Sequence, residues 1–476
     1  MKIPSNRQFD RKGFLFFSQC VVIVIAVAFC THYGFQVFLG QPASAGTSGQ
    51  KVQLKGMEKN GTSTVPAMAT DATATEAQFL QTRVISGQTL QNIIPKEGKF
   101  IAVDLVHMKV LLYQDGKVVN TLTVLSKGKP GSPWETPSGL YEVKTKERNH
   151  FSTIGKVNMP YSMQFFGNFF IHGWPTEPDG IPVPEGYSGG CVRLSTADAQ
   201  TVYDFGNIGT GVFIYDKQPT ETNESMLKIK NIPKPAVTAQ AYMVADIDTG
   251  EVYAEKNASE QYPIASVTKL MTATVANETI SFDKEVPVDG SGVWVPPDVS
   301  NKQNEEMSVG DLLYPLLLDS NNEVADSLAR YYGTNLFLKW MNEKAKAIGM
   351  TETHYDDPSG LSKYNISTAS DLFKLARYVV EKKSFILNIT REDQQSVVSN
   401  SGKKYTFSNH THFLDRDDYL GGKIGFTDEA LETYVAIFKE PVGGEEHRIA
   451  FIVLKSDNRK DDVLALLNWF KSAAQV

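Results

Sequence analysis

Two polar stretches divide the 476 residues of this chain and rule out one continuous core. Residues 41–96 are rich in Gly, Ser, Thr, Ala and Gln and contain few aromatic side chains, which is typical of a tether. Residues 217–237 place prolines among Thr, Glu and Lys, a composition that favours an inter-domain linker. The sequence therefore predicts two folded domains, residues 97–216 and residues 238–476.

Residues 1–40 combine a basic start with an apolar continuation. The apolar character extends to Leu39 if two polar residues are tolerated, and such a helix can span a hydrocarbon layer of about 30 Å. A cleavable signal peptide is the alternative, because residues 43–45, Ala-Ser-Ala, resemble a cleavage site. That site lies far beyond the most apolar stretch. We therefore predict a single-pass anchor in the lipid bilayer of the cell membrane, with a basic cytoplasmic stub and the folded domains outside the cytoplasm.

Charge balance and cysteine use exclude several classes of protein. The chain has 47 Lys and Arg against 54 Asp and Glu, a formal net charge of −7, whereas a nucleic-acid binder normally presents a basic face. Cys20 and Cys30 lie in the N-terminal apolar segment, which leaves Cys191 alone in the rest of the chain. No internal disulfide can form there, and no Cys/His spacing indicates zinc. We expect no metal ion, no cofactor and no nucleic-acid partner.

Cys191 stands in a motif that favours a reactive thiol. His172 follows an apolar stretch upstream, where it can act as the base that deprotonates the thiol, and Arg193 can pair with a substrate carboxylate. The small residues that let a substrate approach the backbone closely are Ser188, Gly189 and Gly190. A buried structural cysteine is the alternative, which this glycine-rich and charged context disfavours. We therefore predict that Cys191 is a nucleophile.

The segment from Ile101 to about Asp216 resembles the catalytic domain of the L,D-transpeptidases, cysteine enzymes that cross-link bacterial cell-wall peptides. The matching stretches, in chain order, are residues 102–104 and 110–113, Lys-Gly-Lys at 127–129, Thr-Pro-Ser-Gly at 136–139, His172-Gly173, and residues 188–194. The resemblance implies a mostly-β domain and a thioester at Cys191. Many members have a second histidine where this chain has Gly189, so His172 is the single candidate base.

A second catalytic signature lies beyond the linker, at Ser266 and Lys269. If Ser266 opens a helix, Lys269 falls one turn later on the same face, where its amine can reach the hydroxyl. A lysine can serve as base for a serine if burial and a neighbouring cation keep it neutral. Taken alone, the pair is more typical of a helix N-cap with a surface lysine.

Two further motifs remove that ambiguity. Ser320-Asn-Asn322 and Lys423-Ile-Gly425 follow in order, which completes the Ser-x-x-Lys, Ser-x-Asn and Lys-x-Gly set of the penicillin-interacting serine enzymes. From Ala239 onward the chain resembles a D-alanyl-D-alanine carboxypeptidase or endopeptidase of that group. The resemblance implies an α/β sandwich.

The resemblance also implies a role for each motif residue. Ser266 would be acylated with Lys269 as its base, and Ser320 would relay a proton to the leaving group. Asn322 would hold the substrate backbone, and Lys423 would steer the terminal carboxylate and keep Lys269 deprotonated. Ile424 and Gly425 would also contact the substrate, with the backbone N–H groups of Ser266 and Phe426 as the oxyanion hole.

Ile424 departs from the usual pattern, in which a threonine or serine hydroxyl binds the terminal carboxylate of the substrate. Loss of that hydrogen bond would cost roughly 1–3 kcal/mol. It would weaken a carboxypeptidase, whereas an endopeptidase, whose substrate has no free carboxylate there, would be less affected. It is also compatible with a domain that only binds wall peptide.

We therefore predict a two-domain α+β enzyme of bacterial peptidoglycan, with stem peptides as substrates and β-lactams as inhibitors. Its activities would be L,D-transpeptidation and a serine D,D-carboxypeptidase or endopeptidase reaction. One alternative is an active cysteine domain joined to an inactive peptide-binding domain. The other is a generic cysteine hydrolase with a structural partner domain.

Overall fold

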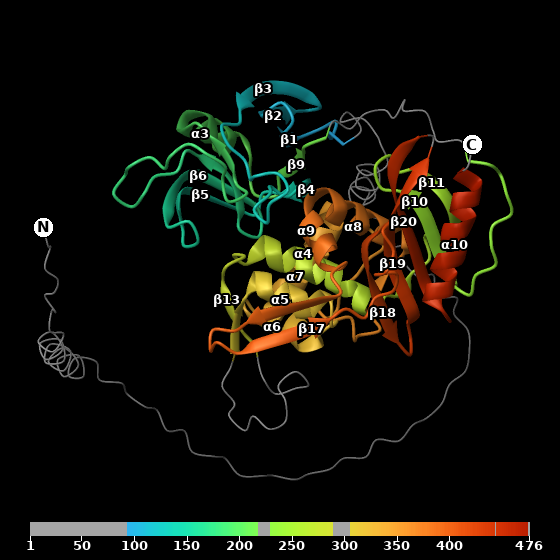
Figure 1. The fold of residues 1–476 in the computed structure, drawn as a ribbon. Helices are drawn as coiled ribbons and strands as arrows, with labels where there is room; N and C mark the ends of the chain where they lie inside the picture. Colours follow the sequence, from blue (N-terminus) through green and yellow to red (C-terminus); the bar gives the residue numbers. More distant parts are fainter. Residues whose placement is uncertain (1–92, 218–228, 289–304, 443, 475–476) are drawn as a thin grey trace, which may run out of the picture. The chain divides into compact units, whose positions relative to one another are not determined.

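The computed structural model describes residues 93–217, 229–288, 305–442 and 444–474 (Figure 1). The predicted anchor and nearly all of the predicted tether lie outside the described residues, as does about half of the predicted linker. Among the described helices, none is both long and apolar enough to cross a membrane.

The first domain contains a five-stranded sheet in the order β3-β2-β1-β9-β4. Strands β2 and β3 form a hairpin that turns at Asp115 and Gly116, which both have positive φ. The strands are β1 (Lys99–Asp104), β2 (Lys109–Gln114), β3 (Lys117–Thr123), β4 (Gly139–Glu142) and β9 (Gly211–Tyr215).

A four-stranded sheet in the order β5-β6-β7-β8 completes this domain. Ile171, Val192 and Leu194 face a core that also contains residues of the first sheet and of α3 (Thr196–Phe205). Because side chains alternate along a strand, His172 and Arg193, which pair across β7 and β8, lie on the opposite face. The strands are β5 (Thr145–Ser152), β6 (Val157–Phe166), β7 (Phe169–Gly173) and β8 (Val192–Leu194). The described part of this domain is mostly β, as predicted.

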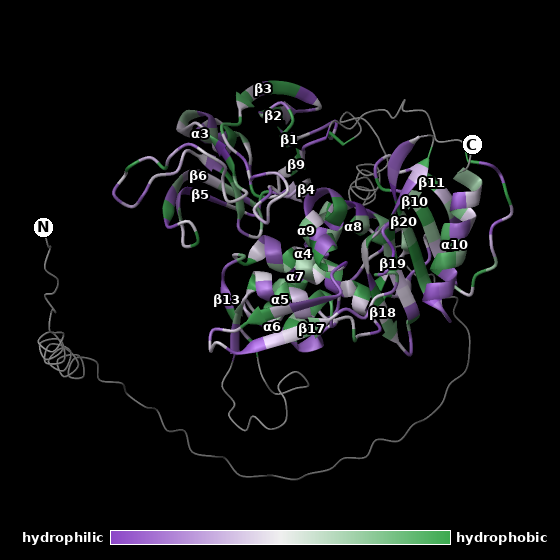
Figure 2. Ribbon diagram, in the orientation of Figure 1, coloured by the Kyte–Doolittle hydropathy of each residue, from purple (hydrophilic) through white to green (hydrophobic). Residues whose placement is uncertain are grey.

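The second domain is built on an antiparallel sheet in the order β11-β10-β20-β19-β18. One face packs on α10 (Arg459–Ala474), whose hydrophobic and hydrophilic residues are distinguished in Figure 2. The other face packs on a helical layer that includes α4 and α8. The strands are β10 (Ala241–Asp246), β11 (Val252–Lys256), β18 (Tyr419–Thr427), β19 (Leu431–Val442) and β20 (Glu445–Ser456). The predicted layering of helices on both faces of a sheet is therefore present.

Helix α4 (Thr268–Thr279) is buried along its whole length and begins directly after the short helix η2 (Ala265–Val267). The other helices are α5 (Val309–Leu317), α6 (Asn322–Arg330), α7 (Thr334–Ala347), α8 (Ala369–Lys382) and α9 (Ser384–Ile389). Three small strand pairs join β12 (Tyr262–Pro263) to β15 (Ile366–Ser367), β13 (Glu285–Val288) to β14 (Glu305–Ser308), and β16 (Gln394–Val398) to β17 (Lys404–Ser408).

Candidate active sites

The loop before β8 holds Cys191 at the edge of the four-stranded sheet. Its Sγ lies 3.7 Å from the carbonyl oxygen of Asn168, and the side chain remains partly exposed. Gly190 has φ +103°, and a Cβ there would lie 2.2 Å from the Phe169 ring. Only glycine therefore fits this position, whereas a Cβ at Gly189 would meet open space.

Ser188 bonds to the loop itself. Its Oγ donates to the Cys191 carbonyl at 2.6 Å and accepts from Gly190 N at 3.1 Å. Its own N–H donates to the Lys127 carbonyl at 2.8 Å. These bonds fix the turn before Cys191, so the buried Ser188 positions Cys191. The predicted close approach of a substrate to Ser188 remains a prediction.

His172 lies on the face of the four-stranded sheet that points away from the Ile171 core. It is buried there, and its Nδ1 lies 2.6 Å from the Gly173 carbonyl. A carbonyl oxygen only accepts, so Nδ1 has the proton and Nε2 is left as an acceptor. Burial, helped by Arg193 and His150, lowers the pKa of His172 to about 4. Burial also raises the pKa of the Cys191 thiol to about 11, against the opposing effects of the Phe170 backbone and Arg193. Both groups are thus neutral at pH 7, which favours proton transfer during attack over a preformed ion pair.

Arg193 lies over the Trp174 ring, with 5.6 Å between its guanidinium carbon and the ring centroid. Its Nε is buried and has no hydrogen-bond partner among the described residues. A desolvated cation with an unused donor favours an anionic ligand such as a carboxylate.

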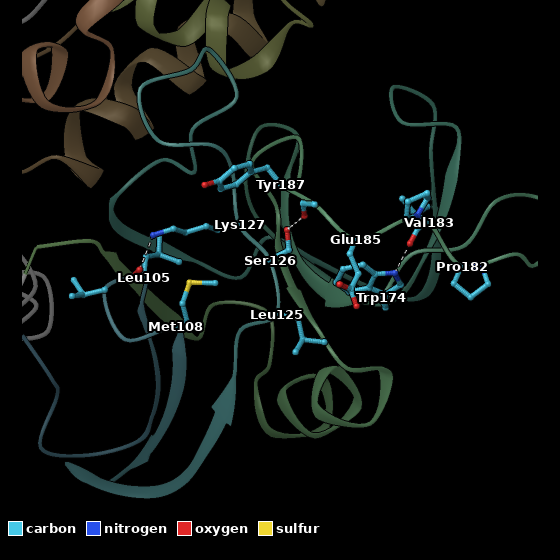
Figure 3. Close-up of a pocket in the computed structure, with 13 residues that line it drawn as sticks. Leu105, Met108, Leu125, Ser126, Lys127, Trp174, Pro182, Val183, Glu185 and Tyr187 are labelled. Atoms are coloured by element: carbon cyan, nitrogen blue, oxygen red, sulfur yellow. Dashed lines mark hydrogen bonds between the residues drawn. The ribbon is translucent and has the colours of Figure 1, made fainter.

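Trp174 also lines a cavity of about 1000 Å³, shown in Figure 3. Three hydrogen bonds stabilise its wall. They run from Lys127 Nζ to the Leu105 carbonyl at 2.7 Å, from Ser126 Oγ to the Gly186 carbonyl at 2.6 Å, and from Trp174 Nε1 to the Val183 carbonyl at 2.8 Å. The lining combines apolar side chains with Lys127 and Glu185. It is assembled from three loops that are distant in the chain and share no motif, so the sequence did not predict it.

His150 is a further residue of this face that the sequence analysis missed. Its ring stacks on Phe170 with 4.7 Å between centroids, and its Nδ1 donates to Glu147 Oε1 at 2.8 Å. His150 contributes to lowering the pKa of His172. Only the pairing of β5 with β6 in the four-stranded sheet brings it near, since its spacing from the Cys191 motif carries no signal.

The serine site lies where η2 passes into α4. Lys269 is fully buried, and its Nζ lies 3.0 Å from Ser266 Oγ, 2.8 Å from Asn322 Oδ1 and 2.6 Å from the Ser359 carbonyl. Burial lowers the pKa of Lys269 to about 7. Ala265, just before the serine, has φ +47°, a strained conformation of the kind that clusters at functional sites. The structure therefore brings the predicted nucleophile and base into contact.

Ser320 and Asn322 flank the start of α6. Ser320 has φ +56°, and its buried Oγ has no hydrogen-bond partner in the part of the chain that the structure describes. Such a hydroxyl is available to a substrate. Asn322 uses its Oδ1 on Lys269, so it positions the base, a role that the sequence did not predict.

Strand β18 brings the third motif beside Ser266. A Cβ at Gly425 would lie 2.8 Å from Ser266 N, so glycine is needed for the strand to pass the nucleophile. Lys423 is buried, and burial together with repulsion from Lys269 holds its pKa well below the usual range. Ile424 packs, partly buried, against the cluster that includes α10, whereas the side chain of Phe426 is exposed. The predicted oxyanion hole and the predicted contact of Ile424 with substrate remain predictions.

No group of three His, Cys, Asp or Glu side chains within the described ranges is arranged to hold a metal ion. The chemistry that the two sites offer is acyl transfer, to a thiol in one and to a hydroxyl in the other.

Two family models match separate parts of the chain. Residues 228–458 match the D-alanyl-D-alanine carboxypeptidase family, and residues 98–214 match the L,D-transpeptidase catalytic domain. The chain is 36% identical to the D-alanyl-D-alanine endopeptidase of Escherichia coli over 41% of this chain and 66% of that protein. It is also 36% identical to the Haemophilus influenzae protein of that name, over 42% of this chain and 70% of that protein.

A crystal structure of penicillin-binding protein D2 from Listeria monocytogenes in its cefotaxime-bound form is 30% identical, with a TM-score of 0.42, covering 50% of this chain and 98% of that one. The chain spans about two thirds of the length of the two endopeptidases. It belongs to the D-alanyl-D-alanine carboxypeptidase family and has an L,D-transpeptidase catalytic domain before that region.

Proposed function

We propose that this protein remodels bacterial peptidoglycan with two acyl-transfer sites, an L,D-transpeptidase site at Cys191 and a serine D,D-peptidase site at Ser266. The observation that supports this most directly is the contact between the predicted nucleophile and base of the second domain, with 3.0 Å between Ser266 Oγ and the amine of the buried Lys269. In the first domain, Arg193 is near enough to both His172 and Cys191 to lower the pKa of each. Family membership supplies the substrate class, the stem peptides of the cell wall.

In the cysteine site, the Cys191 thiol would give its proton to Nε2 of His172 as the sulfur attacks a stem-peptide carbonyl carbon. The peptide bond then breaks, the leaving amine takes the proton from His172, and a thioester remains. An acceptor amine attacks that thioester and loses a proton to His172, which returns it to the departing sulfur. Arg193 is placed to hold a substrate carboxylate through its unused Nε.

In the serine site, Lys269 would take the hydroxyl proton of Ser266 as the oxygen attacks the carbonyl carbon before a terminal D-alanine or a cross-link. Ser320, whose Oγ is buried and unused among the described residues, would pass a proton to the leaving amine. Water then releases the ester. Removing D-alanine from a pentapeptide would make the tetrapeptide donor for the cysteine site, a gain in local concentration.

One observation favours the alternative of a serine-type domain that only binds wall peptide. Ile424 occupies the position of the family hydroxyl and packs against the α10 cluster, so it offers the substrate carboxylate no hydrogen bond. An endopeptidase would tolerate the same change.

A fluorescent penicillin tests the serine site in the full-length protein. We expect covalent labelling of the wild type and none of Ser266→Ala, because the β-lactam carbonyl is attacked by the same hydroxyl. Mass analysis of products from pentapeptides and from cross-linked dimers then separates carboxypeptidase from endopeptidase activity. A folded wild type that is neither labelled nor active on either substrate would establish the binding-module alternative.

We also propose that residues 1–40 anchor the protein in the cell membrane with both catalytic domains outside the cytoplasm. The basic start and apolar continuation of this segment support the proposal. Intact-mass measurement of the protein purified from membranes should give the full-length chain. A mature chain that begins near Gly46 would show instead that a signal peptide is removed.

A further inference from the structure

The turn formed by residues 357–362 is organised by one carboxylate. Asp357 Oδ1 accepts from Ser359 N at 2.6 Å, Ser359 Oγ at 2.7 Å and Gly360 N at 2.7 Å. Its Oδ2 accepts from Ser362 N at 2.6 Å. Four hydrogen bonds to one charged group, three of them from backbone N–H groups, hold the conformation of the turn.

This turn contacts both members of the serine pair. The Ser359 carbonyl accepts from Lys269 Nζ at 2.6 Å. Gly360, at φ +90°, lies so close to the nucleophile turn that a Cβ there would be 2.0 Å from the Ala265 carbonyl oxygen and 3.0 Å from Ser266 N. Any shift of the turn would therefore move the base, the nucleophile or both.

Other bonds hold the turn onto α4. Thr272 Oγ1 donates to the Pro358 carbonyl at 2.6 Å. Asn365 Nδ2 donates to Thr268 Oγ1 at 3.0 Å and to the Asp357 carbonyl at 2.9 Å. The turn and the helix that bears Lys269 thus form one rigid support, with Asp357 at its centre.

Charged groups of three elements surround the Lys269 amine. The carboxylates of Asp357, in the turn, and Asp326, on α6, raise the pKa of Lys269 against the larger lowering by burial. The Lys423 amine, on β18, is near enough for the charge of Lys269 to lower the pKa of Lys423. Other charges act on these neighbours of Lys269. Arg330 lowers the pKa of Asp326, whereas Arg459 lowers and Asp319 raises the pKa of Lys423.

We propose that Asp357 is a positioning residue of the serine site. It shapes the turn so that the Ser359 carbonyl holds the Lys269 amine. Its charge also sets the pH at which that amine becomes a base. The proposal rests on the proposed role of Lys269. Asp326 shares only the effect of a negative charge on the pKa of Lys269. The hydrogen bonds that hold the turn of residues 357–362 go to Asp357, and none of them involves Asp326.

The test replaces Asp357 by Asn in the full-length protein and measures two quantities. The first is the pH dependence of Ser266 acylation by a fluorescent penicillin. Removing the negative charge makes the ammonium form of Lys269 less stable, so its pKa falls and the rising limb moves to lower pH, by about one unit. The plateau rate should fall about tenfold, because the amide replaces one acceptor oxygen by a donor.

The second quantity is the titration midpoint of Lys269, observed by NMR with lysine labelled with ¹³C at Cε and assigned by its loss in Lys269→Arg. This readout does not depend on turnover. Asp326→Asn should move the midpoint to lower pH without lowering the plateau rate, which tests the charge without disturbing the turn. Asp356→Asn is the matched control, because the carboxylate of that exposed neighbour accepts only from Ser362 Oγ among the described residues, so its loss should change neither quantity.

The two measurements separate the two proposals. An unchanged midpoint in folded Asp357→Asn, or an equal shift in Asp356→Asn, would overturn the positioning role. If the midpoint moves as expected while the wild type is never acylated, the role of Asp357 stands and the catalytic function proposed for Ser266 is wrong.

Discussion

Cys191→Ala should abolish formation of cross-links between L- and D-centres, and His172→Ala should lower the rate by about 10²–10⁴-fold, the usual contribution of a general base. The loss follows from the neutral state of the site. With the thiol pKa raised to about 11, few Cys191 side chains are ionised at pH 7, so attack needs Nε2 of His172 to take the proton. Mass analysis of cross-linked products from tetrapeptide donors gives the rate.

The pH dependence supplies a second check of the same site. Because the pKa of His172 is lowered to about 4, this histidine stays neutral above that pH, and its protonation should cause no loss of activity between pH 5 and pH 8. His107→Ala is the control for His172→Ala and should leave the rate unchanged, since that histidine is mostly exposed and pairs with Asp104 at a turn. Cross-linking that survives in Cys191→Ala would rule out the assignment of the nucleophile.

Lys269→Ala should lower the rate of Ser266 acylation by a fluorescent penicillin by about 10²–10⁴-fold. The amine lies 3.0 Å from Ser266 Oγ, and with a pKa of about 7 roughly half of it is neutral at pH 7. Its removal leaves the hydroxyl without a base and the Ser359 carbonyl without its donor. The rate constant of acylation, followed by gel fluorescence against time, measures the effect.

The matched control is Lys284→Ala, which removes an exposed lysine of the same domain and should leave the rate unchanged. Thermal unfolding of both variants checks that the fold is retained. An acylation rate in folded Lys269→Ala close to that of the wild type would assign the base to another group.

Much of the fold followed from local signals in the sequence. The turn at Asp115 and Gly116 was predictable because its residues tolerate positive φ, and the apolar run of residues 110–113 before it is typical of a largely buried strand. The order of the serine motifs gave the second domain its class, which the family match supports. The spacing of Ser266 and Lys269 placed both on one side of a helix start, where the structure has them 3.0 Å apart.

The sequence alone predicted the nucleophiles, their bases and the class of chemistry, because those residues lie in recognisable motifs that follow one another in a fixed order. Only the tertiary structure decided which distant groups act on them. His150 reaches the cysteine face through the pairing of β5 with β6, and Asp357 reaches Lys269 through a turn that packs on α4. It also decided that Ile424 packs against the α10 cluster. Burial and electrostatics depend on contacts between segments far apart in the chain, and local spacing does not encode them.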